Sequence, residues 1–477
     1  GGSNVAVGAL ALDANTTGSQ NVAVGAQALD AITTASYNVA IGYHALTANT
    51  ISGNTAFGHQ ALKANTTGAG NLAVGKDSLV TNTTGNYNIA VGYDALQQNN
   101  ANNNTAVGHD ALKLNTTGNY NTAVGRQALA SNTTASSNTA VGNDCLDANT
   151  TGAENTAVGQ GALTANTTAS NNTALGSNAM LSNTTGGSNV AIGHDSMEST
   201  NSDNNVAVGF EAMKSTSTGD NNTAIGWQAL TANTTGDRNT AVGYGALDAN
   251  TTGTLNTAIG YNSMSNGGTS AEQNCAMGME TLRDITTGAY NSAIGRSAGE
   301  QVTSGTNNSF LGKNAGRSGS PGGQITTQSN NVILGDGSVQ NLYCSDTSIS
   351  SSDSRDKTDV TDFTKGLDWI KALRPITYRW DKRCWYGSGT EGASDEFMGT
   401  PDGSKKRTQL HIGFLAQEAL AVEQANGYGS SNDDSLCINL TEDGTQYGMK
   451  YERLVPILVN AIKELSARVE ELESKSD

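Results

Sequence analysis

Most of the chain repeats one short alternation of small, apolar and polar positions. The pattern Asn-[Thr/Val]-Ala-[Val/Ile]-Gly recurs from Asn4 onward at intervals of 16 to 18 residues, mostly 17, and looser copies begin at Asn308 and Asn331. Within each unit the residue after Asn and the Val or Ile two positions later alternate with Ala, which is the period of a β-strand. One face of the predicted strand therefore carries Thr or Val and Val or Ile, and the other carries only Ala.

The second half of each unit is open to two interpretations. It begins with Gly-x-x-Ala-Leu, as in residues 92–96, and ends with Asn-Thr-Thr-Gly, as in residues 115–118. The first piece fits a short second strand or a helical turn, and the second predicts a polar turn in which Gly adopts positive φ. A period this short excludes helical-pair repeats and predicts a solenoid of stacked coils. Twenty coils at ~4.8 Å each would give a rod of about 95 Å.

The repeat also predicts an assembly, because one such ribbon encloses little interior. Faces of Ala and single Leu residues favour three chains wrapped around a common axis. We therefore expect a mainly β fold, with a homotrimeric parallel β-roll or β-helix-like shaft over residues 1–315. The period breaks around Pro321, which indicates a neck over 316–351. A small α+β domain is expected over 352–477, ending in a coiled coil over 452–473.

The last part of the chain has the patterns of ordinary secondary structure. We predict a helix from Phe363 to Leu373 that is capped by Thr361 or Asp362 and stopped by Pro375, followed by a strand through Trp380. A strand over 410–415 runs into a helix over 416–426, and a hairpin spans 436–449. Heptads follow, with Val455, Ile462 and Val469 at a, and Leu458, Leu465 and Leu472 at d. β-Branched a residues with Leu at d favour two strands in simple coiled coils; we expect the preceding domain to impose a trimer.

Composition narrows the function classes. The chain has 477 residues, of which only 36% are hydrophobic and 5% aromatic, and 57 are Gly. This composition has too few large apolar side chains for the conventional core of a chain of that length. Charged residues make up only 14%, so regular repetition explains this composition better than disorder. The net charge of −17 argues against a nucleic-acid partner.

No site for a metal or cofactor is predicted. No apolar run of ~18 residues predicts a membrane span, and no signal peptide is evident. The five Cys are dispersed and predict isolated thiols, and the His residues are too scattered for a metal site. The scattered His are His44, His59, His109, His194 and His411.

Candidate chemistry lies in residues 351–357, Ser-Ser-Asp-Ser-Arg-Asp-Lys, between the repeats and the last domain. A Ser hydroxyl needs a base to become a nucleophile, and Ser-Lys pairs provide one. The Lys must be neutral, which desolvation or a nearby positive charge promotes. Here Lys357 follows Ser352 by five residues, with Arg355 between them.

This segment resembles the start of the C-terminal intramolecular chaperone of phage tail spikes and fibres, the endosialidase-type autoprotease. The resemblance continues, in order, through Gly-Leu-Asp at 366–368, Leu-Arg-Pro-Ile-Thr-Tyr-Arg-Trp at 373–380, His-Ile-Gly-Phe-Leu-Ala-Gln-Glu at 411–418, Tyr-Glu-Arg-Leu at 451–454 and Ala-Ile-Lys-Glu-Leu at 461–465. That family trimerises, guides folding of the preceding fibre and cuts itself off before the motif serine. The resemblance implies Ser352 as nucleophile, Lys357 as base and Ser351–Ser352 as the scissile bond, with Asp353 and Arg355 in supporting roles.

The repeats resemble a second family, the left-handed parallel β-roll heads of trimeric autotransporter adhesins, whose units are usually shorter. Together the resemblances predict a phage tail-fibre shaft, made in the host cytoplasm and placed in the virion. Its expected partners are tail or baseplate proteins at the N-terminus and a host receptor, either a glycan or an outer-membrane component. The chain opens directly in repeat phase, so we expect a missing attachment domain.

Two alternatives remain open. A glycan-degrading tail spike usually needs paired carboxylates about 5–10 Å apart, but no acidic pair recurs at a fixed repeat position and the few aromatic residues offer little surface for sugars. A bacterial trimeric adhesin fits the repeats, but such proteins finish in an outer-membrane β-barrel anchor and this sequence finishes in heptads.

Overall fold

The computed structural model describes residues 1–266, 270–339, 360–381, 386, 400–431, 434–440 and 447–475. It divides into two units, which we describe separately. The first unit contains residues 1–293 and 302–307, and the second contains residues 294–301 and 308–477. The chain is mainly β, as the repeat pattern predicted.

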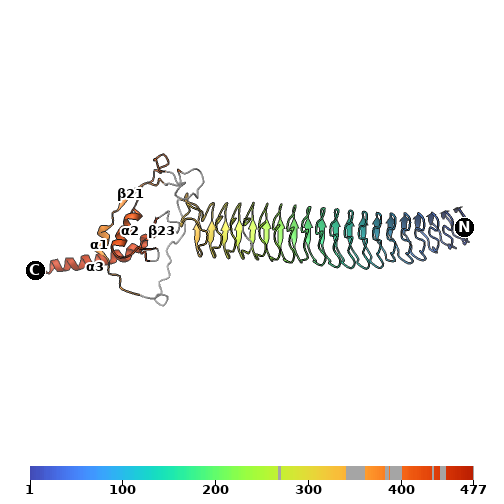
Figure 1. Ribbon diagram of the computed structural model, residues 1–477, viewed down its shortest axis with the longest axis horizontal. Coiled ribbons are helices and arrows are strands. Elements are labelled where there is room, and N and C mark those ends of the chain that lie inside the picture. The colour runs from blue at the N-terminus through green and yellow to red at the C-terminus, as the bar shows by residue number, and fades with distance from the viewer. Residues whose placement is uncertain are drawn as a thin grey trace. The chain divides into compact units, whose positions relative to one another are not determined.

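Each repeat forms one strand of three residues, and the strands stack side by side along the array (Figure 1). The strands belong to one sheet. Through the first seventeen coils each strand pairs in parallel with the strand of the next coil, so that Thr105 lies opposite Thr122 and Ala106 opposite Ala123. The strands are Val5–Val7 (β1), Val22–Val24 (β2), Val39–Ile41 (β3), Thr55–Phe57 (β4), Leu72–Val74 (β5), Ile89–Val91 (β6), Thr105–Val107 (β7), Thr122–Val124 (β8), Thr139–Val141 (β9), Thr156–Val158 (β10), Thr173–Leu175 (β11), Val190–Ile192 (β12), Val206–Val208 (β13), Thr223–Ile225 (β14), Thr240–Val242 (β15), Thr257–Ile259 (β16), Cys275–Met277 (β17), Ser292–Ile294 (β18), Ser309–Leu311 (β19) and Val332–Leu334 (β20).

The interior of each coil is filled by its own chain. The strand residue Ala106 and the turn residues Ala111 and Leu112 are 0% exposed, and the equivalent residues of most other coils are buried in the same way. The Ala faces and Leu side chains therefore do not need neighbouring chains to cover them. This reason for expecting a trimer is wrong, and the trimer itself stays a prediction.

The second half of each unit is a series of turns rather than a strand or a helix. Asp110 and Leu112 adopt left-handed φ of 59° and 50°, and the strand-ending Gly125 has φ 135°. The predicted positive φ at the Gly of Asn-Thr-Thr-Gly is wrong, because Gly118 lies outside the left-handed region. This Gly is instead needed for close packing, since a Cβ on Gly118 would lie 2.1 Å from the carbonyl oxygen of Ala135.

Two ladders of buried Asn side chains run along the interior. In the first, Asn104 Oδ1 accepts the backbone N–H of Asn121 at 2.9 Å, and Asn121 Nδ2 donates to the carbonyl oxygen of Ala135 at 2.9 Å. In the second, Asn115 Nδ2 donates to Asn99 Oδ1 at 2.7 Å. All these Asn residues are 0% exposed. Since buried polar groups must be paired, the amides fix the stacking of one coil on the next, a role that turn chemistry alone did not reveal.

We expect Asn121→Ala to loosen the coils around it. The substitution leaves the backbone N–H of Asn138, which bonds Asn121 Oδ1 at 3.0 Å, without its partner. One orphaned buried group costs about 1–3 kcal/mol, so amide hydrogen exchange in the adjoining coils should accelerate roughly tenfold or more by mass spectrometry. The half-buried Asn143 provides the matched control, and Asn143→Ala should change local stability by less than about 0.5 kcal/mol. Equal protection in both variants would contradict a structural role for the ladder.

The second unit also contains the helices and short hairpins of the C-terminal segment. They are α1 (Leu367–Ala372), β21 (Ile376–Tyr378), β22 (His411–Gly413), α2 (Ala416–Ala425), β23 (Ile438–Leu440), β24 (Tyr447–Met449), a 3-10 turn (Tyr451–Arg453) and α3 (Leu454–Glu473). β21 pairs antiparallel with β22, and β23 with β24. The buried residues Trp369, Cys437, Leu454 and Ile457 form the core. Within the described ranges, no helix combines the length and the apolar character needed to cross a membrane.

Most elements predicted for this segment are confirmed, and one is corrected. The strand–helix unit and the hairpin lie where the sequence indicated, with α2 ending one residue early at Ala425. The first helix begins at Leu367 and not at Phe363. Side-chain hydrogen bonds from α3 hold the residues that precede α1 in a non-helical conformation, as described below.

Candidate functional site

The predicted cleavage residues lie outside the described part of the chain. Ser351, Ser352, Asp353, Arg355 and Lys357 fall within residues 340–359, so their roles stay predictions. The described residues that follow them along the chain begin at Val360 and lead into α1.

The segment that follows the predicted cut is fastened to α3. Asn460 Nδ2 donates to the carbonyl oxygens of Phe363, at 2.6 Å, and Lys365, at 3.2 Å. Glu464 Oε2 accepts the backbone N–H of Leu367 at 3.1 Å, which places a carboxylate at the first turn of α1, where the helix dipole favours it. The chain and α3 approach closely at Gly366, because a Cβ there would lie 2.4 Å from Glu464 Oε1. The position of residues 363–367 therefore depends on α3.

Sequence reasoning did not assign these anchoring roles. Glu464 belongs to the block at 461–465 that is part of the family resemblance. Its hydrogen bond to Leu367, 97 positions earlier, leaves no periodic pattern in the sequence that could have predicted it. Gly366, the first residue of the block at 366–368, was the one local hint of a close approach.

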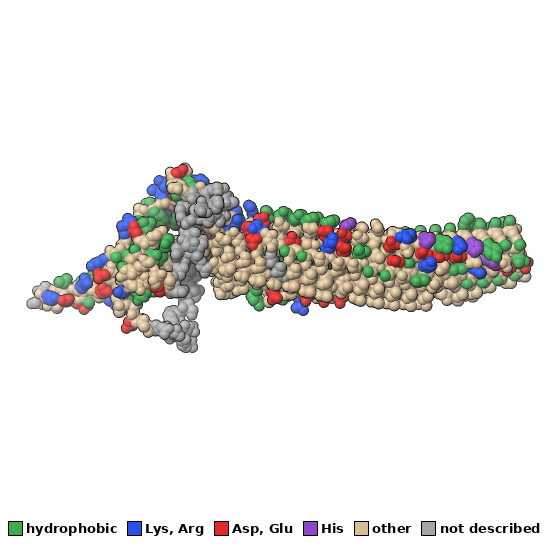
Figure 2. Space-filling view, viewed as in Figure 1, with side chains coloured by type: hydrophobic (Ala, Val, Ile, Leu, Met, Phe, Trp, Pro, Cys, Tyr) green, Lys and Arg blue, Asp and Glu red, His purple; other side chains and the backbone are tan. Residues whose placement is uncertain are grey.

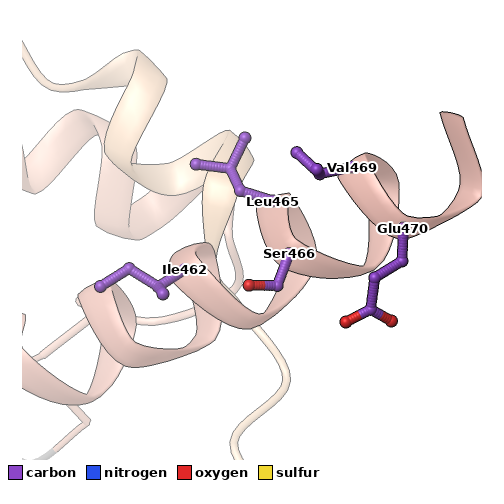
Figure 3. Close-up of a pocket in the computed structure, with 5 residues that line it drawn as sticks. All are labelled: Ile462, Leu465, Ser466, Val469 and Glu470. Atoms are coloured by element: carbon purple, nitrogen blue, oxygen red, sulfur yellow. The ribbon is translucent and has the colours of Figure 1, made fainter. Parts of the chain in front are cut away.

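Helix α3 carries two apolar faces, of which one is covered. Leu454, Ile457 and Ala461 are buried, and α3 packs against α1. The six heptad residues on the adjacent face are all exposed, between 43% and 68% in the single chain. Figure 3 shows Ile462, Leu465 and Val469 of this face projecting from the helix around a shallow hollow that Ser466 and Glu470 also line. Exposed apolar stripes of this kind are typical of interaction surfaces.

A second apolar line follows the outer face of the sheet in the first unit. The third residue of every strand from β1 to β17 is apolar, and the parallel register places these side chains one above the next. Val107, Val124 and Val141 are each 37% exposed, and Ile225 is 42% exposed. We call this line of third strand residues the outer strand face. The Ala at the middle of each strand points inward instead.

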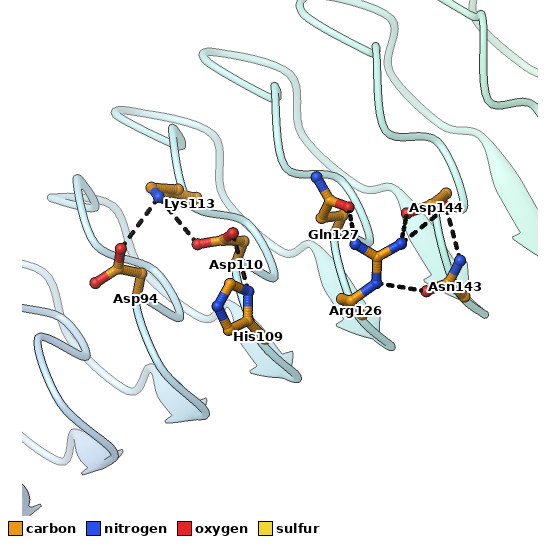
Figure 4. Close-up of polar contacts among 8 residues, drawn as sticks. All are labelled: Asp94, His109, Asp110, Lys113, Arg126, Gln127, Asn143 and Asp144. Carbon is orange, nitrogen blue, oxygen red and sulfur yellow. Dashed lines mark hydrogen bonds and ion pairs between the residues drawn. The ribbon is translucent and has the colours of Figure 1, made fainter.

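Charged side chains gather at the turn that follows the strand-ending Gly in several coils (Figure 4). Lys113 Nζ lies 3.1 Å from Asp94 Oδ2 and 3.0 Å from Asp110 Oδ1, and Arg126 Nη2 lies 3.2 Å from Asp144 Oδ1 (Figure 4). Hydrogen bonds to Asp110 and then Asp94 raise the pKa of Lys113. Charged and His side chains gather in a line along the array in the view of Figure 2. The Arg126–Asp144 pair is largely exposed, and exposed ion pairs contribute about 0–1 kcal/mol each to stability. Asp94, in the Lys113 pair, is buried.

No other candidate for nucleophilic or metal chemistry emerges from the described residues. Cys145, Cys275 and Cys437 are free thiols, as predicted, but Cys275 is only half-buried. Burial raises the pKa values of Cys145 and Cys437 to about 12 and about 11. The two buried thiols are unreactive because the thiolate is the nucleophile. Cys344 and Cys384 lie outside the described residues. In the part that the structure describes, no three His, Cys, Asp or Glu residues converge to hold a metal ion.

Comparison with known proteins bears on the C-terminal segment. A search among curated proteins finds no match. The family model described as "Chaperone of endosialidase" matches residues 352–428, a range that begins at Ser352 and covers α1, β21, β22 and α2. This chain thus joins a parallel β-solenoid to a segment that is similar to the chaperone of endosialidase.

Proposed function

We propose that the chain is a homotrimeric tail fibre or tail spike of a bacteriophage, whose last segment guides folding of the trimer and then cleaves itself off between Ser351 and Ser352. The observation that carries this proposal is the family match at 352–428, which starts at Ser352 and follows a long β-solenoid. The predicted place of the protein is the virion tail, with other tail or baseplate proteins as N-terminal partners and adhesion to the host surface as its task.

The proposed cut is an intramolecular acyl transfer followed by hydrolysis. Ser352 Oγ attacks the carbonyl carbon of Ser351 while Lys357 accepts the hydroxyl proton, which forms an ester and breaks the peptide bond. The freed α-amine of Ser352 takes up a proton, and water then hydrolyses the ester to a carboxylate on Ser351. The positive charge of Arg355 favours neutral Lys357, and Asp353 fixes the turn.

The trimer is supported by the two uncovered apolar lines. The heptad face of α3 and the outer strand face are both too long and too apolar to be scattered surface residues. Both parts of the chain also resemble trimeric families, and this resemblance favours three chains over the two that Val and Ile at a with Leu at d would favour alone.

The heptad face provides a direct test of assembly. In Leu465→Asp a buried charge would replace an apolar contact between chains, while Leu465 is 47% exposed in the single chain and outside its core. We expect sedimentation velocity to show loss of the trimer and a rise in aggregated protein. Lys463→Ala, which changes an exposed position of α3 off the a and d stripe, should leave the trimer intact. A Leu465→Asp protein that still sediments as a folded trimer would exclude this face from assembly.

The acidic side chains that cluster in the described part of the shaft do not form the carboxylate pair that glycan hydrolysis needs. Asp195, Glu198 and Glu211 lie together, but Lys214 Nζ pairs with each of them, at 3.5, 3.4 and 2.8 Å. Hydrogen bonding to Lys214 lowers the pKa of Glu211, which is opposite to the shift that a general acid needs.

A further inference from the structure

Five aromatic side chains from five successive coils form one continuous stack. Each follows a strand-ending Gly, and the members are His194, Phe210, Trp227, Tyr244 and Tyr261. Their ring centroids are 5.6, 6.0, 4.6 and 5.1 Å apart in that order, with interplanar angles of 9° to 15°. Coil stacking gathers residues 16 or 17 positions apart, so the expectation that the array offers little aromatic surface is wrong here. We call this stack the aromatic ladder.

The aromatic ladder is a local feature of the shaft. In the four coils before it, the same corner holds Arg126, Asn143, Gln160 and Ser177. A corner that tolerates polar residues does not need aromatic rings for folding. The rings remain exposed, at 41% for Phe210, 40% for Trp227, 45% for Tyr244 and 49% for Tyr261.

The geometry of the stack decides what it can bind. Neighbouring rings cover one another's faces, so the surface consists of ring edges: C–H groups, the indole N–H of Trp227 and the hydroxyls of Tyr244 and Tyr261. None of these three polar groups has a hydrogen-bond partner among the described residues. A cation or a flat aromatic ligand needs an open ring face, and the ladder leaves such faces only at its two ends. An elongated ligand with C–H patches and hydroxyl groups fits the edges.

A polar row beside the rings adds acceptors. Gly245, next to Tyr244, has φ 58° and no side chain, and a Cβ there would lie 2.7 Å from Asn262 Oδ1 and 3.6 Å from Asp248 Oδ2. Asp248 Oδ1 is buried without a hydrogen-bond partner in the described chain, and burial raises the pKa of this carboxyl to about 6. Asn262 makes no side-chain hydrogen bond with the described residues either. In the coils of Asp94 and Asp195, by contrast, a Lys neutralises the corner carboxylates.

We propose that the aromatic ladder, with Asp248 and Asn262 beside it, binds a linear neutral polysaccharide that lies along the shaft with about one sugar ring per coil. The rung spacing of 4.6 to 6.0 Å is close to the length of one pyranose unit in an extended chain. An extended peptide rises only about 3.3–3.4 Å per residue and does not keep this register. An acidic polymer is disfavoured by Asp248 and by the net charge of −17. This inference deepens the adhesion part of the proposed function and rests on it.

Affinity electrophoresis of the purified full-length protein tests the proposal. Native gels cast with a linear neutral glucan, mannan or galactan are compared with gels that contain an acidic polysaccharide such as hyaluronan. We expect retardation by at least one neutral polymer and none by hyaluronan. Trp227→Ala and Tyr244→Ala should each weaken retardation at least tenfold, because either substitution removes a central ring and interrupts the ladder on both of its sides. Tyr93→Ala, which removes a ring that contacts His109 and Lys76 outside the ladder, should bind as the wild type does.

Several outcomes would overturn the proposal. They are no retardation by any of the three neutral polymers, equal retardation of Trp227→Ala and the wild type, or preferential binding of hyaluronan. Trp227 fluorescence, isolated as the difference between the wild type and Trp227→Phe, should also be quenched by acrylamide in the assembled protein. A Trp227 that assembly shields from the quencher would assign the ladder to a chain–chain interface. Chain cleavage and oligomeric state are read from the same samples, so failure of sugar binding is distinguishable from failure of the proposed fibre function.

Discussion

Ser352→Ala is expected to leave the protein as a single full-length chain under denaturing electrophoresis, whereas the wild type releases a fragment whose first residue is Ser352. The substitution removes the hydroxyl that attacks the Ser351 carbonyl, so no ester forms and the peptide bond persists. Loss of a nucleophile that acts through a covalent intermediate should abolish the reaction within detection, an effect of several orders of magnitude. N-terminal sequencing of the released fragment identifies the bond.

The base and the neighbouring serines supply the controls. Lys357→Ala should block the cut as Ser352→Ala does, while Ser354→Ala should cut normally, since register against Lys357 selects Ser352 among the adjacent serines. Cleavage at the same bond in Ser352→Ala would show that the nucleophile is another residue. A folded wild-type trimer that never cuts would show a chaperone without protease activity.

Deletion of residues 352–477 is expected to convert the repeat array from a soluble assembly into misfolded, aggregated protein. Each strand repeats nearly the same residues, so a slip of one coil between chains again places the apolar outer strand face of one chain beside the same face of another. The register of one chain against the next is therefore weakly specified by the array itself. We expect the C-terminal segment with α3 to set this register. The soluble fraction and sedimentation of the truncated chain measure the effect.

A shorter truncation separates loss of the chaperone from loss of chain length. Deletion of residues 474–477 keeps α3 through Glu473 and should leave folding unchanged. Soluble, thermostable trimers from the chain without residues 352–477 would show that the array finds its register alone.

Local sequence patterns predicted the elements whose determinants are local. The alternation around Ala106 identified the strand, and the pattern after His411 identified β22 and α2. The inward direction of Ala106 could not be assigned to its own coil, because it depends on the left-handed turn at Leu112, which apolar spacing does not encode. The prediction of positive φ at Gly118 failed for a related reason. Gly is needed there because the carbonyl oxygen of Ala135 on the next coil leaves no room for a side chain.

The candidate sites show the same division. The cleavage residues were readable as a motif, since Ser352 and Lys357 lie close together in the sequence. The anchoring of residues 363–367 by Asn460 and Glu464 joins groups more than 90 positions apart, and no periodicity reports it. The aromatic ladder was hidden because its members look isolated until the coils stack.

The central claim is that the chain folds as a trimer before it cuts itself. Native mass spectrometry of Ser352→Ala, which keeps every chain intact, tests this claim most directly. The account predicts one folded species at three times the chain mass of 48.8 kDa. A stable, folded species at the mass of a single chain would contradict it.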